Sequence, residues 1–108
     1  MKKAIPFLLL SLACSAHGAT WKDSPYVEIT KLYPTDGGMA FYTTYSDTSV
    51  SSCDSGTRFG ILSTDENYEV KVSTLLAAFM AGKKVLLRYD SSQEKQCSAI
   101  INRFMVAR

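Results

Sequence analysis

The sequence predicts a mostly-β fold with one helix, in the order β-β-β-α-β-β. Residues 72–82 read VSTLLAAFMAG, an apolar stretch of helix formers without a single charge. Three runs rich in β-forming residues precede this stretch and two follow it. Three strands, one helix and two strands is the element order of the OB-fold, a five-stranded Greek-key barrel whose loops and open face bind oligosaccharides or oligonucleotides.

The three N-terminal strands are predicted over 26–33, 39–45 and 58–62. Residues 21–25 are a short polar lead-in, and Pro34–Gly38 has the proline and glycines of a turn between the first two strands. Residues 46–56 are polar and rich in serine, which predicts a surface loop. Gly60, inside the third strand, indicates a bulge or a close approach of another backbone segment.

The helix is predicted to begin with a capping box formed by Ser63 and Glu66 and to run to Ala81, with Gly82 ending it. Its core side is an apolar stripe at positions i, i+3, i+4 and i+7, formed by Val72, Leu75, Leu76 and Phe79. The last two strands are predicted over 83–89 and 98–106.

The opposite face of the helix is small and uncharged. It consists of Thr74, Ala77, Ala78 and Ala81. Because exposed helices normally carry charge opposite the core, this face is predicted to pack against another subunit. The alternative is an ordinary solvent-exposed face, since alanine is the best helix former.

The first 19 residues are predicted to be a secretory signal peptide, followed by a single domain over 20–108. Two lysines form its basic region, residues 4–13 its apolar region and small residues its cleavage zone. Cleavage is expected after Ala19, with Gly18 as the alternative. The apolar run is too short to span a bilayer, so the mature protein is expected in the periplasm or outside the cell.

The predicted domain is formally neutral. Removal of the signal removes two lysines, which leaves ten basic and ten acidic residues in 20–108. Nucleic-acid binding depends on clustered lysine and arginine that neutralise phosphates, so the composition argues against a nucleic-acid partner.

Two of the three cysteines, Cys53 and Cys97, are predicted to form a disulfide, because exported chains with an even cysteine number usually pair them. A metal site is less well supported, since two thiols without a local partner do not make a zinc site. The third cysteine, Cys14, leaves open the alternative that it carries a lipid anchor, although Ser11 occupies the position at which lipid-attachment motifs usually have leucine.

The sequence predicts a protein that is not an enzyme and uses no cofactor or metal. His17, the only histidine, is lost with the signal. The domain then has no histidine to act as nucleophile, general base or metal ligand. No pair of acidic residues is marked by its spacing as the machinery of a glycosidase.

The candidate binding residues are aromatic or cationic. The domain has six tyrosines and Trp21, whose amphipathic rings suit sugar stacking and interfaces, although aromatic residues are also common in strands. Tyr26 and Tyr42 are the tyrosines that we select as glycan-binding candidates. Arg58 could hold a carboxylate, such as that of a sialic acid, in bidentate fashion; the alternative is a solvated arginine on an edge strand.

Several short motifs resemble a group of short exported bacterial proteins. They are Cys53 followed by GTRFGI at 56–61, a helix that ends in Ala81-Gly82-Lys83-Lys84-Val85, and Cys97 before the last strand. The same plan resembles the B subunits of the pertussis-like and subtilase-type AB5 toxins, in which a helix ends in Thr-Gly-Gln-x-Val-Arg-Ile.

That resemblance implies an OB-fold, a ring of five copies and binding to host glycans, often sialylated. The toxin subunits begin with a tryptophan and then a serine that contacts sialic acid. Trp21 and Ser24 occupy similar places, so the resemblance implies a glycan contact for Ser24.

The sequence therefore predicts a secreted, non-catalytic, glycan-binding B subunit of an AB5-type toxin. Its expected partners are identical copies in a homopentamer, a toxin A subunit and host cell-surface glycans, which the ring would bind by avidity. The glycan-binding candidates are Ser24, Tyr26, Tyr42 and Arg58. One alternative is a monomeric periplasmic OB-fold module that binds a small ligand or envelope component; another is an inhibitor or interaction protein that uses residues 46–56.

Overall fold

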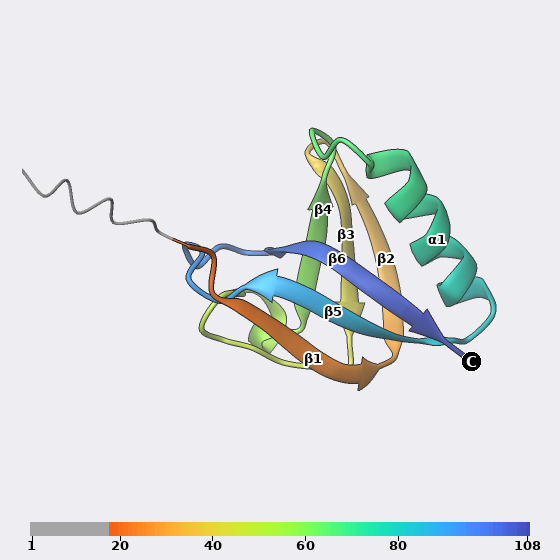
Figure 1. Cartoon of the computed structure of the whole chain (residues 1–108), viewed down its shortest axis with the longest axis horizontal. Coiled ribbons are helices and arrows are strands. Elements are labelled where there is room, and N and C mark those ends of the chain that lie inside the picture. Colours follow the sequence, from red (N-terminus) through yellow and green to blue (C-terminus); the bar gives the residue numbers. More distant parts are fainter. Residues whose placement is uncertain (1–17) are drawn as a thin grey trace, which may run out of the picture.

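Six strands and one α-helix form the part of the chain that the computed structural model describes, residues 18–108 (Figure 1). The predicted class, mostly β with one helix, is confirmed. A short 3-10 turn, Asp54–Gly56, precedes β4. The elements are β1 (Trp21–Val27), β2 (Ile29–Thr35), β3 (Gly38–Thr43), β4 (Arg58–Leu62), α1 (Tyr68–Met80), β5 (Lys84–Asp90) and β6 (Ala99–Ala107).

The predicted signal peptide, except for Gly18 and Ala19, lies outside the described residues. Cys14 and His17 lie outside them too. Within residues 18–108, no helix is long and apolar enough to cross a membrane.

The strands form one mixed sheet in the order β1-β5-β6-β4-β3-β2. All neighbouring strands are antiparallel except β4 and β6, which are parallel where Phe59 and Gly60 pair with Ala99 and Ile100. Figure 1 shows β2, β3 and β4 running across the direction of β1, β5 and β6, with α1 beside them. The first and last strands of this order, β1 and β2, are consecutive in the chain, with only Glu28 between them.

The strand count differs from the predicted five because the expected first strand, 26–33, is two strands. Residues up to Val27 pair with β5, whereas residues from Ile29 onward pair with β3, so the chain changes partner at Glu28. The polar lead-in expected at 21–25 is part of β1. The β1–β5 register shifts between Asp23 and Tyr26, where Pro25 has no N–H to donate to a ladder.

The core lies between the two halves of the sheet and one side of α1. Strand alternation supplies its side chains; in β5, Val85, Leu87 and Tyr89 are all buried. The largest fully buried rings are those of Tyr89, Phe41 and Phe59. Tyr89 keeps its hydroxyl satisfied inside the protein, with its oxygen 2.8 Å from that of Tyr45.

The segment 46–56, predicted to be a surface loop, contributes to the interior instead. Val50 and Ser51 have no exposed surface, and Asp47 is buried. The segment folds inward because its polar groups find partners: the Ser51 hydroxyl donates to the Arg58 carbonyl at 2.7 Å. The predicted disulfide is confirmed, with Cys53 and Cys97 bonded and their Cα atoms 4.6 Å apart.

The two ends of the helix differ in how well the sequence predicts them. Gly82 has a φ of 65° and follows the last helical turn, as expected for a residue that ends a helix. The predicted capping box is wrong, because α1 begins at Tyr68 rather than after Ser63. Asp65 organises the preceding turn instead, where its carboxylate accepts a hydrogen bond from the Asn67 N–H at 2.9 Å.

The helix is also rotated relative to the predicted stripe. Leu75 and Ala78 are the buried helix residues, whereas Leu76 is 46% exposed. Ala78 was expected on the outer face; it lies in the core, where its small side chain lets the helix backbone approach the sheet. The exposed small residues are therefore Thr74, Ala77 and Ala81, and their role in a subunit interface stays a prediction.

Candidate functional site

An open groove of about 330 Å³ lies on the face of β3 and β4 that points away from the core. Its floor consists of Gly38, Ala40 and Gly60, which have no side chain or only a methyl group. In the β3–β4 ladder Ala40 lies opposite Gly60, so two small residues of neighbouring strands meet at one point. The concave shape follows directly from this pairing.

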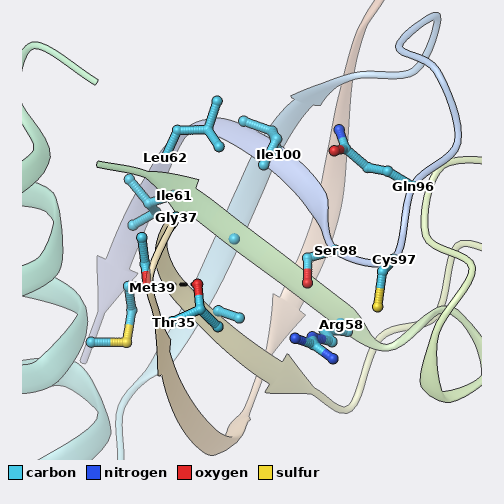
Figure 2. Close-up of a pocket in the computed structure, with 13 residues that line it drawn as sticks. Thr35, Gly37, Met39, Arg58, Ile61, Leu62, Gln96, Cys97, Ser98 and Ile100 are labelled. Carbon is cyan, nitrogen blue, oxygen red and sulfur yellow. Dashed lines mark hydrogen bonds between the residues drawn. The ribbon is translucent and has the colours of Figure 1, made fainter. Parts of the chain in front are cut away.

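The groove runs along β4 (Figure 2). Figure 2 shows Arg58 and Cys97 at one end and Leu62 at the other. Thr35, at the end of β2, and the turn that follows it supply one wall, and the segment just before β6 supplies the other with Gln96 and Ser98. The disulfide thus holds one wall of the groove to the segment before β4.

The two glycines of the floor, Gly38 and Gly60, differ in whether a side chain would fit in their place. A Cβ on Gly38 would stand 2.1 Å from the Ile61 carbonyl oxygen, and its φ is +147°, so no other residue fits there. Gly60 has no such constraint, since a Cβ would meet its nearest atom, the Met39 carbonyl oxygen, at 3.4 Å. The β3–β4 register is regular across Gly60, so the bulge considered from the sequence is absent.

Arg58 is held between two tyrosine rings at the end of the groove. Its guanidinium carbon lies 4.6 Å from the centre of the Tyr33 ring and 5.8 Å from that of Tyr42. These distances are those of cation–π contacts. Tyr42 on β3 pairs directly with Arg58 on β4. Tyr33 lies one strand further away, on β2, where it pairs with Ala40 of β3.

The Arg58 guanidinium has unused hydrogen-bonding capacity. Its Nε is buried without a hydrogen-bond partner, and no ion pair of Arg58 is found within residues 18–108. A buried donor without a partner carries a desolvation cost. Arginine presents a planar fork of donors that matches a carboxylate.

Two further charges flank the ring of Tyr42. The Lys31 amine lies 5.4 Å from the ring centre. The Asp54 carboxylate, beside the Tyr42 hydroxyl, raises the pKa of Tyr42, so the phenol stays neutral. Arg58 lines one end of the groove and is accompanied there by two tyrosine rings, a lysine and a carboxylate, whereas serine and glutamine lie in the groove wall.

These groups offer three kinds of contact to a ligand. A guanidinium suits a carboxylate, the tyrosine rings suit the apolar side of a sugar, and Ser98 and Gln96 can exchange hydrogen bonds with hydroxyl groups. In the described part of the chain, no group of three or more His, Cys, Asp and Glu side chains could hold a metal ion.

The structure brings together two of the four predicted glycan-binding residues, Tyr42 and Arg58. Tyr26 lies on the other half of the sheet, where it lines a separate hollow with Lys83 and Lys84. Ser24 is buried, and its hydroxyl is already used: it donates to the Pro25 carbonyl at 2.7 Å and accepts from the Leu87 N–H at 2.8 Å. Ser24 is thus not free to contact a ligand.

Tyr33, Gln96 and Ser98 were not among the site residues predicted from the sequence. Tyr33 becomes a neighbour of Arg58 only through the pairing of β2 with β3 and of β3 with β4. The tight turn after Pro34 sets the register of β2 against β3. Counting outward from this turn along both strands would have placed Tyr33 on the same face of the sheet as Tyr42. Gln96 and Ser98 reach the groove through the parallel β4–β6 pair, for which the sequence carries no local signal.

Comparison of the chain with known protein families, with curated proteins and with solved structures gave no match. The groove is therefore the feature from which we infer a function.

Proposed function

We propose that this chain is a non-catalytic OB-fold protein that binds an acidic saccharide in the groove over β3 and β4. The observation that carries this proposal is the Arg58 guanidinium, which is stacked between Tyr33 and Tyr42 and has no ion pair within residues 18–108. A carboxylate placed against the guanidinium would gain a charge-assisted bidentate contact.

The strand order supports the OB-fold part of this proposal. If β1 and β2 are counted as one bent strand interrupted at Glu28, the chain has five strands, with the helix between the third and the fourth. The bent strand then pairs with β5 at one end and with β3 at the other, which links the two edges of the sheet order. This arrangement is expected of a small, partly open Greek-key barrel.

The position of the groove supports the ligand-binding part. OB-folds bind ligands on the face of their second and third strands and with the loops between strands one and two and between strands four and five. In the five-strand count these are β3, β4, the turn at 35–38 and the segment that includes Gln96 and Cys97, all of which line the groove.

The charge balance favours a saccharide over a nucleic acid. Residues 18–108 contain ten basic and ten acidic side chains, so no excess of positive charge is available to neutralise a phosphate backbone. One stacked arginine beside two tyrosines and a hydroxyl-bearing wall is suited to a single carboxylate on a polyhydroxylated ligand.

The wider hypothesis is an exported B subunit of an AB5-type toxin, which would assemble as a homopentamer with an A subunit and bind host glycans. It rests on the sequence resemblance and on the uncharged outer face of α1. Light scattering during size exclusion of the oxidised protein tests it: five copies support the ring, and a single copy favours the alternative, a monomeric periplasmic binding module.

Calorimetric titration tests the saccharide site itself. We expect the methyl glycoside of sialic acid to bind and its methyl ester, which lacks the charge, to bind at least tenfold more weakly. Arg58→Gln should abolish this difference, whereas the control Arg108→Gln, which removes an equal charge outside the groove, should retain it. Equal binding of acid and ester to the unmodified protein would refute the role of Arg58.

The floor of the groove offers a second test with a matched control. Gly60→Ala places a methyl group in the floor without a close contact, so the protein should fold normally and bind the sugar more weakly. Ser73→Thr, the control, adds one methyl group at an exposed position of α1 that does not line the groove. Equal affinities of the two variants would place the ligand elsewhere.

A further inference from the structure

A second hollow lies beside the groove and shares a wall with it. It encloses about 260 Å³ and is lined by Trp21, Asp65, Asp90, Gln93, Ile100 and Asn102, among others. Ile100 also lines the groove over β4, so the two hollows meet at this residue. A ligand in the groove could extend over Ile100 into the second hollow.

Trp21 gives this hollow an aromatic wall. It is the only tryptophan of the chain and is 47% exposed, at the start of β1 opposite Asp90. An exposed indole ring offers the largest flat apolar surface of any side chain and one N–H donor. Its position at the rim of a hollow makes it a platform on which a sugar ring can stack.

The hollow also has one unused acceptor and one unused donor. Oδ1 of Asp90 accepts hydrogen bonds from the Thr20 and Ser92 N–H groups at 3.1 and 2.9 Å, whereas its Oδ2 has no partner within residues 18–108. Asn102 accepts from Arg103 through Oδ1 at 3.0 Å and leaves its Nδ2 without a partner in the same range. A sugar hydroxyl can donate to such a carboxylate, and a neighbouring hydroxyl can accept from such an amide.

The surrounding bonds hold these groups in place. Gln93 donates to the Ile100 carbonyl at 3.0 Å and accepts from its N–H at 2.9 Å, so it braces β6 and is not itself available. Lys71 contacts the Asp65 carboxylate and the Asn102 carbonyl, both at 2.6 Å, which ties the turn before α1 to β6. Asn102 sits where the β5–β6 register shifts, an irregularity that redirects a side chain.

The second hollow carries an unpaired negative charge at Asp90, which has no ion pair within residues 18–108, whereas Asp65 is paired with Lys71. Asp65 and Asp90 are its charged lining groups, and hydrogen bonds to their carboxylates lower the pKa of each, so both are ionised at neutral pH. Carboxylates favour hydroxyl donors and repel an acidic sugar. An acidic group is therefore suited to the groove at Arg58, and a neutral sugar is suited to the second hollow.

We propose that the two hollows form one extended site for an oligosaccharide, with a terminal acidic residue at Arg58 and a neutral sugar of the same chain stacked on Trp21. This inference rests on the proposed function and adds a second sugar position to it. Arg58 and Gly60 are two residues, about 7 Å, apart along β4, and three strand spacings of about 5 Å each separate β4 from β1, so only an oligosaccharide reaches both ends.

The experiment compares a monosaccharide with an oligosaccharide that carries it. The probes are the methyl glycoside of sialic acid and 3′-sialyllactose, titrated by calorimetry and by the fluorescence of Trp21, the only indole in the chain. We expect 3′-sialyllactose to bind about tenfold more tightly and to be the probe that shifts the emission, in keeping with the energy of one aromatic contact.

Trp21→Ala should remove the preference for the oligosaccharide and leave the affinity for the monosaccharide unchanged. Trp21→Phe should retain part of the preference, and Tyr26→Ala, which removes another exposed ring of β1, should retain all of it. Asn102→Ala provides an independent variant in case Trp21→Ala folds poorly, and it should also reduce the preference.

The outcomes separate this inference from the proposed function. If both probes bind the unmodified protein equally, or if Trp21→Ala keeps the preference, the second sugar position is wrong while Arg58-dependent binding of the monosaccharide still stands. If neither probe binds, the extended site and the acidic-saccharide function are both overturned.

Discussion

Asp47 should make the free energy of unfolding depend on pH, and a single substitution can isolate this contribution. Only 8% of its surface is exposed, and its carboxylate accepts hydrogen bonds from the Ser49 N–H at 3.0 Å, from the hydroxyl groups of Ser49 and Tyr89, and from Lys22 at 3.2 Å. Burial acts to raise the pKa of Asp47, but these donors outweigh it and lower the pKa from 3.8 to about 2.

The magnitude follows from the difference between the folded and unfolded pKa of this carboxyl group. A difference of nearly two units corresponds to about 2 kcal/mol of folding free energy. Because the folded pKa is the lower one, this stabilisation is fully present well above pH 3.8. It is lost as the pH falls from about 4 to about 2, where the folded carboxyl group also takes up a proton.

The assay is urea unfolding of the unmodified protein and of Asp47→Asn between pH 6 and pH 2, with the disulfide intact. Asparagine does not titrate, and the remaining carboxylates are the same in both proteins, so their contributions cancel in the difference. We expect the difference in unfolding free energy to shrink by about 2 kcal/mol over this range. Asp36→Asn, at an exposed turn residue without an ion pair in the described part of the chain, serves as the control.

A difference between the two proteins that is the same at pH 6 and pH 2 would refute this reasoning. It would mean that the carboxylate of Asp47 gains nothing from Tyr89, Ser49 and Lys22 that a neutral amide does not also gain.

Three further predictions concern stability and assembly. Gly38→Ala should lower the unfolding free energy by more than about 1 kcal/mol in urea titrations, since its Cβ would collide with the Ile61 carbonyl; a neutral effect would contradict this. Ala78→Asp should prevent stable folding, as measured by circular dichroism, because it buries an unpaired charge. The Ala77→Asp variant should fold, and if the protein forms a ring, it should have a lower mass by light scattering. Replacing both disulfide cysteines by serine should cost about 4 kcal/mol for a loop that spans 44 residues, and an unchanged urea midpoint would argue against this.

Local chemistry made several parts of the fold predictable. The bounds of β4, the end of the helix at Gly82 and the disulfide each depend on residues whose preferences act locally or on a simple pairing rule. The core stripe of the helix was predicted less well, since Leu76 and Ala78 differ by two positions and periodicity alone does not say which of them faces the sheet.

The missed features depend on contacts between distant parts of the chain. Ser24 is buried because the Leu87 N–H, on β5, needs an acceptor where Pro25 interrupts the ladder. The segment that contains Asp47 turns inward because Tyr89 and Lys22 reach it from two other strands. The candidate site shows the same division: Arg58 and Tyr42 stand out by residue type, while Tyr33 joins them only through strand register.

The pairing of β1 with β5 sets the order in which this chain can complete its fold. Trp21 lies opposite Asp90, so the first strand has no partner until nearly all of the chain is available. The β2–β3 hairpin needs only neighbouring residues and can form early, whereas closing the β1–β5 ladder has a large entropic cost and comes late. During that interval β1 is an unpaired edge, and a newly made chain is at its most vulnerable to association with other chains.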